Sequence, residues 1–254
     1  MRIFNSSLKF GISISFLCLF ITVAYGQSSE NSPTRSNAFF GSGFFISDDG
    51  FVITTNHIIE GAKKVFIKTR DRDVWLQASV IKVDAANDLA LLRIPKKSTG
   101  LSLAHWDEVP LGLEVYVIGY PLGNAQGYGV RITEGIISGD QGVGARQNEL
   151  FQLSAQTQRG NSGGPVFSPD GRVVGVVQSK IDAIKMLQKT NDFPQSINFA
   201  LKSSVIEKFL AGMDVSYRAE TINLGVRMRP YEAFRAKEKS VVRVMAFTTI
   251  AEVN

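Results

Sequence analysis

The chain has 254 residues, of which 44% are hydrophobic and 20% are charged, and its formal net charge is +5. This mixture is typical of a globular protein and excludes a disordered or fibrous chain. The positive charge is mild and scattered along the sequence, so no nucleic-acid partner is expected.

The N-terminal segment has the pattern of a secretory signal. Arg2 and Lys9 give a basic start, residues 10–24 are almost wholly apolar, and residues 24–26 (AYG) place small side chains where a signal peptidase cuts. We therefore predict a signal peptide over residues 1–26 and an exported protein, periplasmic or secreted. The apolar stretch is shorter than the roughly 20 residues that span a bilayer. No stable membrane span is expected after cleavage, and an uncleaved anchor is the alternative.

A first group of short strands follows a polar, flexible lead-in at residues 27–37. Runs of β-type residues alternate with turn signals such as the DDG at residues 48–50. These runs predict a first unit over about residues 38–100. Its expected strands are residues 39–47, 51–55, 65–69, 74–83 and 89–94.

A second group of strands predicts another unit over about residues 111–200. Its expected strands are residues 114–120, 129–138, 150–155, 166–167, 173–179 and 196–200. Residues 200–213 have apolar side chains at helical spacing and predict a helix that ends near Gly212. Two groups of about six evenly spaced strands favour an all-β domain, residues 38–213, built from two antiparallel barrels or sandwiches.

The tail, residues 214–254, is richer in arginine and lysine and has strand-like pieces at residues 222–227 and 241–247. About 40 residues rarely form a core of their own. We therefore expect this extension either to pack on the second barrel or to be part of something incomplete.

The strongest local signal for chemistry is the GNSGGP sequence at residues 160–165. A serine hydroxyl such as that of Ser162 is a poor nucleophile unless a base takes its proton and donors hold the developing oxyanion. Flanking glycines allow backbone N–H groups to face a substrate. A glycine-rich hairpin turn without chemistry is the alternative.

Two histidines are available as the base, and His57 is the better candidate. It lies just after a predicted strand, whereas His105 lies in a polar connection where an exposed or capping role is favoured. Asp88 opens the apolar run LALL, so its carboxylate is expected near the core, where a histidine N–H would be a suitable partner. Taken alone, Asp88 is better explained as a turn residue after Asn87.

Several motifs together resemble the trypsin-like serine peptidases, and more narrowly their high-temperature-requirement (HtrA/DegP-like) branch. The resemblance covers about residues 38–212. The motifs are GSGFFI at 41–46, TNH at 55–57, NDLALL at 87–92, GYPLG at 119–123, TEGIIS at 133–138, GNSGGP at 160–165 and INFA at 197–200.

The resemblance implies a chymotrypsin-like double β-barrel with the active site between the barrels. By carry-over, Ser162 is the nucleophile, His57 the general base and then acid, and Asp88 the residue that orients His57. The backbone N–H groups of Gly160 and Ser162 would form the oxyanion hole. No metal and no organic cofactor is implied.

The substrate pocket is also expected from the resemblance. Ile197, Asn198 and Phe199 would line it and pair with the substrate backbone. Gln156 stands six residues before the nucleophile, where trypsin has an aspartate, so cleavage after lysine or arginine is not favoured and a small or medium apolar P1 residue is expected.

The resemblance also implies a further domain and an assembly. HtrA-type proteases carry PDZ modules after the protease, and residues 214–254 are compatible with an incomplete one. They are often trimers joined through N-terminal aromatic residues, a role that Phe39 and Phe40 would fill; ordinary core packing is the alternative for these two.

The leading functional hypothesis is an endopeptidase that acts on unfolded or damaged exported polypeptides through an acyl-enzyme intermediate. A non-catalytic chaperone or peptide-binding module on the same fold is the main alternative. An esterase that uses the same three side chains is a further one.

Overall fold

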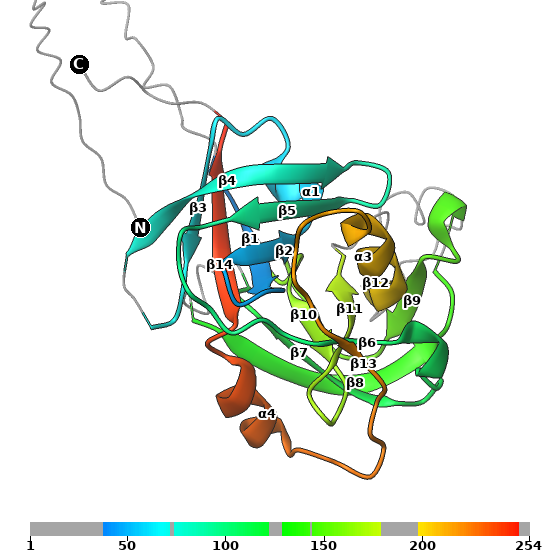
Figure 1. Cartoon of the computed structure of the whole chain (residues 1–254). Coiled ribbons are helices and arrows are strands. Elements are labelled where there is room, and N and C mark those ends of the chain that lie inside the picture. Colours follow the sequence, from blue (N-terminus) through cyan, green and yellow to red (C-terminus); the bar gives the residue numbers. More distant parts are fainter. Residues whose placement is uncertain (1–37, 72–73, 122–128, 143, 179–197, 249–254) are drawn as a thin grey trace, which may run out of the picture. The chain divides into compact units, whose positions relative to one another are not determined.

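A computed structural model of the chain describes residues 38–71, 74–121, 129–142, 144–178 and 198–248. These residues form two antiparallel β-barrels with few helices (Figure 1). The predicted all-β, double-barrel fold class is therefore confirmed. The expected signal peptide and lead-in, residues 1–37, lie outside the described residues.

The first barrel is closed by six strands in the order β1-β14-β3-β4-β5-β2. Phe45, Val52, Ile67 and Leu92, which are at most 1% exposed, belong to the apolar cluster that fills this barrel. The strands are β1 (Ala38–Phe45), β2 (Phe51–Thr54), β3 (Lys64–Lys68), β4 (Trp75–Asp84), β5 (Leu89–Arg93) and β14 (Val241–Phe247).

The C-terminal extension, residues 214–254, was expected to pack on the second barrel or to be part of something incomplete, but its strand β14 belongs to the first barrel. β14 pairs along its whole length with β1 and, on its other edge, with β3. Its inward side chains, Val242, Val244 and Ala246, are fully buried. The first group of predicted strands has five members, so this distant segment supplies the sixth strand of the closed barrel. A relationship between residues 214–254 and a PDZ module stays a prediction.

The second barrel has the strand order β10-β7-β8-β9-β12-β11 and is closed by pairing of β10 with β11. Two short strands, β6 and β13, extend the sheet beside β11 in parallel. The expected strand at residues 222–227 is not formed, and only β13 precedes it. The strands are β6 (Leu103–Ala104), β7 (Glu114–Gly119), β8 (Arg131–Gly139), β9 (Leu150–Leu153), β10 (Pro165–Phe167), β11 (Val173–Val177), β12 (Asn198–Lys202) and β13 (Ala219–Glu220).

The helix expected at residues 200–213 is shorter in the structure. Residues 200–202 belong to β12, which pairs with β9 and β11, so the helix begins only at Ser203. None of the helices in the described residues is long and apolar enough to cross a membrane. The described helices are α1 (Asn56–Ile59), η1 (Trp106–Glu108), η2 (Gly144–Arg146), α3 (Ser203–Leu210) and α4 (Pro230–Lys237).

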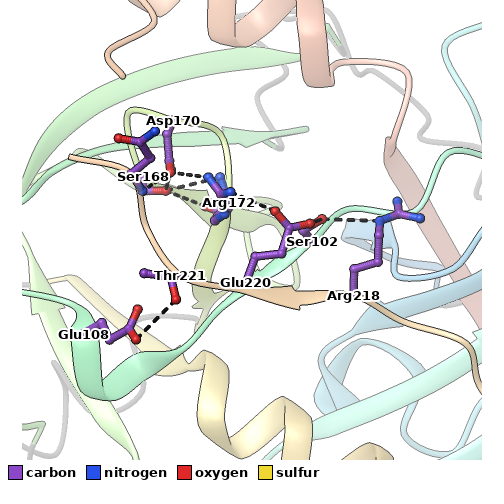
Figure 2. A network of polar contacts seen from close by, with 9 residues as sticks. Ser102, Glu108, Ser168, Asp170, Arg172, Arg218, Glu220 and Thr221 are labelled. Carbon is purple, nitrogen blue, oxygen red and sulfur yellow. Dashed lines mark hydrogen bonds and ion pairs between the residues drawn. The ribbon is translucent and has the colours of Figure 1, made fainter. Parts of the chain in front are cut away.

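The two barrels share one apolar cluster, in which Ile53 and Leu89 of the first barrel pack with Ile118 and Val176 of the second. A polar network joins the C-terminal segment to the second barrel (Figure 2). Its central residue, Arg172, forms ion pairs with Asp170 and with Glu220 of β13. The chain then passes through α4 and returns to the first barrel as β14.

Candidate active site

Asp88 holds His57 at two points. The backbone N–H of His57 donates to Oδ1 of Asp88 at 2.8 Å, and ring atom Nδ1 lies 2.8 Å from Oδ2. The N–H of Asn56 also donates to the backbone carbonyl of Asp88, at 3.2 Å. The single turn of α1 is thus attached to the start of β5, which fixes both the backbone and the ring of His57.

The backbone of Asp88 is in the left-handed region, with φ of +55°. Aspartate tolerates this conformation better than most non-glycine residues. The preceding turn is closed by Asn87, whose backbone and side-chain amide both donate to the Asp84 carboxylate, at 3.0 and 2.8 Å. Burial raises the pKa of Asp84, but these hydrogen bonds, together with that of the Ala86 backbone and the charge of Lys82, outweigh it and the pKa is lowered. The turn therefore presents Asp88 to α1.

The exposure of the pair suits proton transfer. The Asp88 side chain is 11% exposed and that of His57 is 36% exposed. A neutral imidazole that donates from Nδ1 to a carboxylate keeps Nε2 as an acceptor. Nδ1 of His105, the other histidine, instead lies 3.8 Å from Oε1 of Glu207. Of the two histidines, the structure therefore pairs His57 with Asp88, as the sequence predicts.

Ser162 lies in a tight turn before β10 and is 3% exposed. Asn161 N–H donates to the carbonyl of Gln158 at 3.0 Å, and Gly164 N–H donates to the carbonyl of Asn161 at 2.8 Å. The φ angles of Gly160 and Gly163 are +97° and +82°. These are values that residues with a Cβ rarely adopt, which accounts for glycine on each side of the serine.

The turn around Ser162 contacts the first barrel where His57 is attached. The N–H of Ser42 in β1 donates to the carbonyl of Ser162 at 2.9 Å. A Cβ on Gly163 would lie 2.2 Å from the carbonyl oxygen of Ser42 and 3.1 Å from the backbone nitrogen of Thr55, which precedes α1. The turn of the second barrel that carries Ser162 thus lies against β1 and the start of α1, which belong to the first barrel.

Ser42 was not predicted as a site residue, although it lies in one of the recognised motifs. It is fully buried, and its hydroxyl donates to the carbonyl of Gly160 at 2.6 Å and accepts the N–H of Tyr120 at 2.8 Å. The sequence signal that points to such a role is a serine within an otherwise apolar predicted strand, because a hydroxyl buried there requires partners.

The residues expected to bind substrate have different environments. Gln156 is exposed, and its carbonyl accepts a hydrogen bond from the Thr133 hydroxyl at 2.9 Å. It lines an open cavity of about 500 Å³ together with Ile132, Glu134, Ser154 and Pro230. This cavity lies along β8 and reaches the start of α4. Substrate binding by Gln156 stays a prediction.

Asn198 and Phe199 are buried in β12. The Asn198 amide accepts from the Thr157 hydroxyl at 2.6 Å and donates to the Ala155 carbonyl at 2.9 Å. Its side chain therefore fixes the segment that leads to the Ser162 turn. Ile197, the third residue expected here, lies outside the described residues.

Unsatisfied polar atoms occur beside the site. Among the buried side chains of the described residues, Thr55 Oγ1, Asn161 Oδ1 and both amide atoms of Gln178 lack a hydrogen-bond partner. Gln178 follows Val177, whose carbonyl accepts the Gly163 N–H at 2.9 Å. Sequence patterns gave no indication of Gln178. Within the same residues no group of three or more histidine, cysteine or acidic side chains gathers as a metal site would.

Comparison with known families and curated proteins shows to which family the chain belongs. A family model described as a trypsin-like peptidase domain matches residues 41–176. A protein named "Probable periplasmic serine endoprotease DegP-like", from Bartonella henselae, is 38% identical over 157 residues, which are 59% of this chain and 30% of that protein. "Uncharacterized protein y4bJ" of Sinorhizobium fredii is 40% identical over 176 residues, which are 69% of this chain and 28% of that protein.

A solved structure, the HtrA-type protease AlgW with a decapeptide, is similar with a TM-score of 0.56 and 26% identity. The likeness covers 67% of this chain and 50% of that one. The chain spans less than a third of the length of the two curated relatives.

Proposed function

Because the chain belongs to the trypsin-like peptidase domain family, with DegP-like and HtrA-type relatives, we propose that it is a serine endopeptidase. Ser162 is the nucleophile, His57 the general base and acid, and Asp88 the residue that orients His57. The observation that carries the proposal is the double attachment of His57 to Asp88 beside the glycine-flanked turn of Ser162.

In the acylation step, Nε2 of His57 takes the proton of the Ser162 hydroxyl as Oγ attacks the scissile carbonyl carbon. Asp88 stabilises the imidazolium that forms, without taking its proton. The negative charge on the carbonyl oxygen is held by the N–H groups of Gly160 and Ser162. The tetrahedral intermediate then collapses, His57 protonates the leaving amine, and the acyl group stays on Ser162 as an ester.

Deacylation repeats these roles with water. His57 takes a proton from the water molecule, which attacks the ester carbonyl, and the same two N–H groups hold the oxyanion. His57 then returns a proton to Ser162 Oγ, which releases the carboxylic acid product. No metal or organic cofactor enters this sequence of steps.

We assign unfolded or damaged exported polypeptides as substrates and a small or medium apolar residue as P1. The basis is the relatives described as periplasmic endoproteases and the uncharged Gln156 in place of an acidic residue. Export with removal of residues 1–26, and a periplasmic or secreted location, belong to the same proposal. A panel of peptides that differ only at P1 tests the preference, and faster cleavage after lysine or arginine would contradict it.

A homotrimer is the proposed assembly. Phe39 is 45% exposed at the start of β1. The neighbouring Phe40 ring is covered by the Arg243 guanidinium, 4.9 Å from its centroid. Light scattering on the wild-type chain and on Phe39→Ala tests the proposal, with a trimeric mass expected only for the wild type. A monomeric wild type would contradict it.

The proposed activity is tested with casein and the variant Ser162→Ala. Loss of the nucleophile should reduce kcat/KM by at least about 10⁴-fold. Ser79→Ala, an exposed serine on β4, is the matched control and should keep wild-type activity. Unchanged proteolysis in Ser162→Ala would refute the assignment. A folded wild type without any proteolysis would favour the chaperone alternative, and hydrolysis of simple esters but not of peptides would favour an esterase.

A further inference from the structure

Ser42 connects the first barrel to the turn that carries Ser162. It is fully buried in β1, yet both hydrogen bonds of its hydroxyl reach the second barrel. Oγ donates to the carbonyl of Gly160 at 2.6 Å and accepts the N–H of Tyr120 at 2.8 Å. Ser42 itself is held by the Thr54 hydroxyl, which donates to its carbonyl at 2.7 Å.

The backbone of Ser42 contacts the same turn. Its N–H donates to the carbonyl of Ser162 at 2.9 Å. Ser42 therefore holds the carbonyls of both residues, Gly160 and Ser162, whose N–H groups the proposed mechanism uses as oxyanion donors. Ser42, a residue outside the turn, thus holds two peptide groups of the turn, one through its side chain and one through its backbone.

The two donors depend on Ser42 to different extents. The peptide plane that carries the Ser162 N–H also carries the carbonyl of Asn161, which accepts a hydrogen bond from Gly164 at 2.8 Å. The Gly160 N–H lies in the peptide plane between residues 159 and 160, whereas the carbonyl that Ser42 holds lies in the next plane. Only the φ and ψ rotations of Gly160 separate these two planes. Glycine rotates at little cost, so the backbone of Gly160 does not fix the direction of its N–H, and the hydrogen bond from Ser42 to the Gly160 carbonyl removes part of this freedom.

The surroundings of the hydroxyl are close-packed. A Cβ on Gly119 would lie 3.0 Å from Ser42 Oγ and 2.9 Å from Asn161 Oδ1, so the end of β7 approaches this point without a side chain between. Without the hydroxyl, the Gly160 carbonyl and the Tyr120 N–H would each lose a partner. Unpaired buried polar groups are costly, so rotation of the turn that gives these groups new partners would become favourable.

We propose that Ser42 is a positioning residue that orients the Gly160 N–H toward the oxyanion. The proposal rests on the assignment of Ser162 as the nucleophile and assigns Ser42 no contact with the substrate. Ser42 acts on the transition state and leaves ground-state binding of the peptide unaltered. This separates the role from that of an ordinary buried serine, which would affect folding stability alone.

The test is a kinetic comparison of Ser42→Ala with the wild type, at a temperature well below the melting point of each. We expect kcat on a peptide substrate to fall by about 10- to 100-fold, less than the loss of an entire oxyanion donor, while KM stays within about twofold. The inhibition constant of a peptide trifluoromethyl ketone, whose adduct carries an oxyanion, should rise by the same factor as kcat/KM falls.

Ser168→Ala is the matched control. Ser168 is also fully buried, and its hydroxyl also bonds to backbone groups, those of Arg172, as well as to Asp170 (Figure 2). We expect Ser168→Ala to lower the melting temperature and to leave kcat within about twofold. Ser42→Thr, which keeps the donor, should recover most of the lost kcat. Should Ser42→Ala fail to fold, Ser42→Cys, with its weaker donor, takes its place with the same expectation.

Wild-type kcat in Ser42→Ala, or an equal fall in Ser42→Ala and Ser168→Ala, would overturn the proposal. A rise in KM without a change in kcat would overturn it as well. In those cases the wild-type chain still hydrolyses peptides and the proposed function stands. Absence of turnover in the folded wild type would refute the proposed function and the role of Ser42 together.

Discussion

The closure of the first barrel by β14 makes a quantitative prediction for Val244→Ala. Val244 is fully buried between Gly41 of β1 and Ile67 of β3. The substitution removes two methyl groups, worth about 0.8 kcal/mol each by transfer, or about 1.6 kcal/mol. The cavity left behind raises the expected loss of unfolding free energy to about 2–3 kcal/mol.

Urea unfolding monitored by tryptophan fluorescence measures this loss. For an m-value of about 2.5 kcal/mol/M, the midpoint should fall by roughly 1 M. Met245→Ala on the same strand is the control, because Met245 is only half-buried and should cost about 1 kcal/mol or less. A Val244→Ala midpoint equal to the wild type, or higher than that of Met245→Ala, would refute the inclusion of β14 in the barrel core.

Three further predictions follow from single contacts. Gly163→Ala would place Cβ 2.2 Å from a carbonyl oxygen of β1 and should lower both the melting temperature and kcat. Gly61→Ala, with φ of +68° and open space around it, should lower the unfolding free energy by only about 1 kcal/mol. Equal effects of the two substitutions would contradict this packing. Asp88→Asn should lower kcat by about 10⁴-fold with little change in KM, and a retained kcat would remove Asp88 from the mechanism. Hydrogen bonds from Lys96 and from Thr69 lower the pKa of Asp71 to about 2 from 3.8, so the stabilisation from the Asp71 carboxylate is present above about pH 4 and lost as the pH falls toward 2. The melting-temperature difference between the wild type and Asp71→Asn should therefore shrink over that range, and a difference that grows on acidification would contradict this sign.

Most strands could be predicted because alternating and apolar runs bounded by turn residues are local signals. The run at residues 241–247 was expected, and β14 occupies those residues. Its place between β1 and β3 was not expected, since barrel closure depends on pairing between the two ends of the chain. The helix start was misjudged because Leu201 fits the helical pattern and yet pairs in β12 with Leu150 and Val176.

The candidate site was predictable in its residue types and less so in its supports. His57 and Asp88 were predicted to pair from their positions beside strands together with the family resemblance, and they are in contact. Ser42 and Gly160 are 118 residues apart in sequence, and no local pattern predicts which carbonyl a buried hydroxyl will bind. The one-turn helix that carries His57 was also missed, because four residues are too few for a periodic signal.

The most direct test of the account is labelling with a fluorophosphonate, which reacts with a serine only when a base and oxyanion donors are assembled around it. The account predicts one adduct per folded chain, mapped to Ser162, with no adduct in Ser162→Ala and much slower labelling in His57→Ala. A folded chain that takes no adduct, or one whose adduct persists in Ser162→Ala, would contradict it.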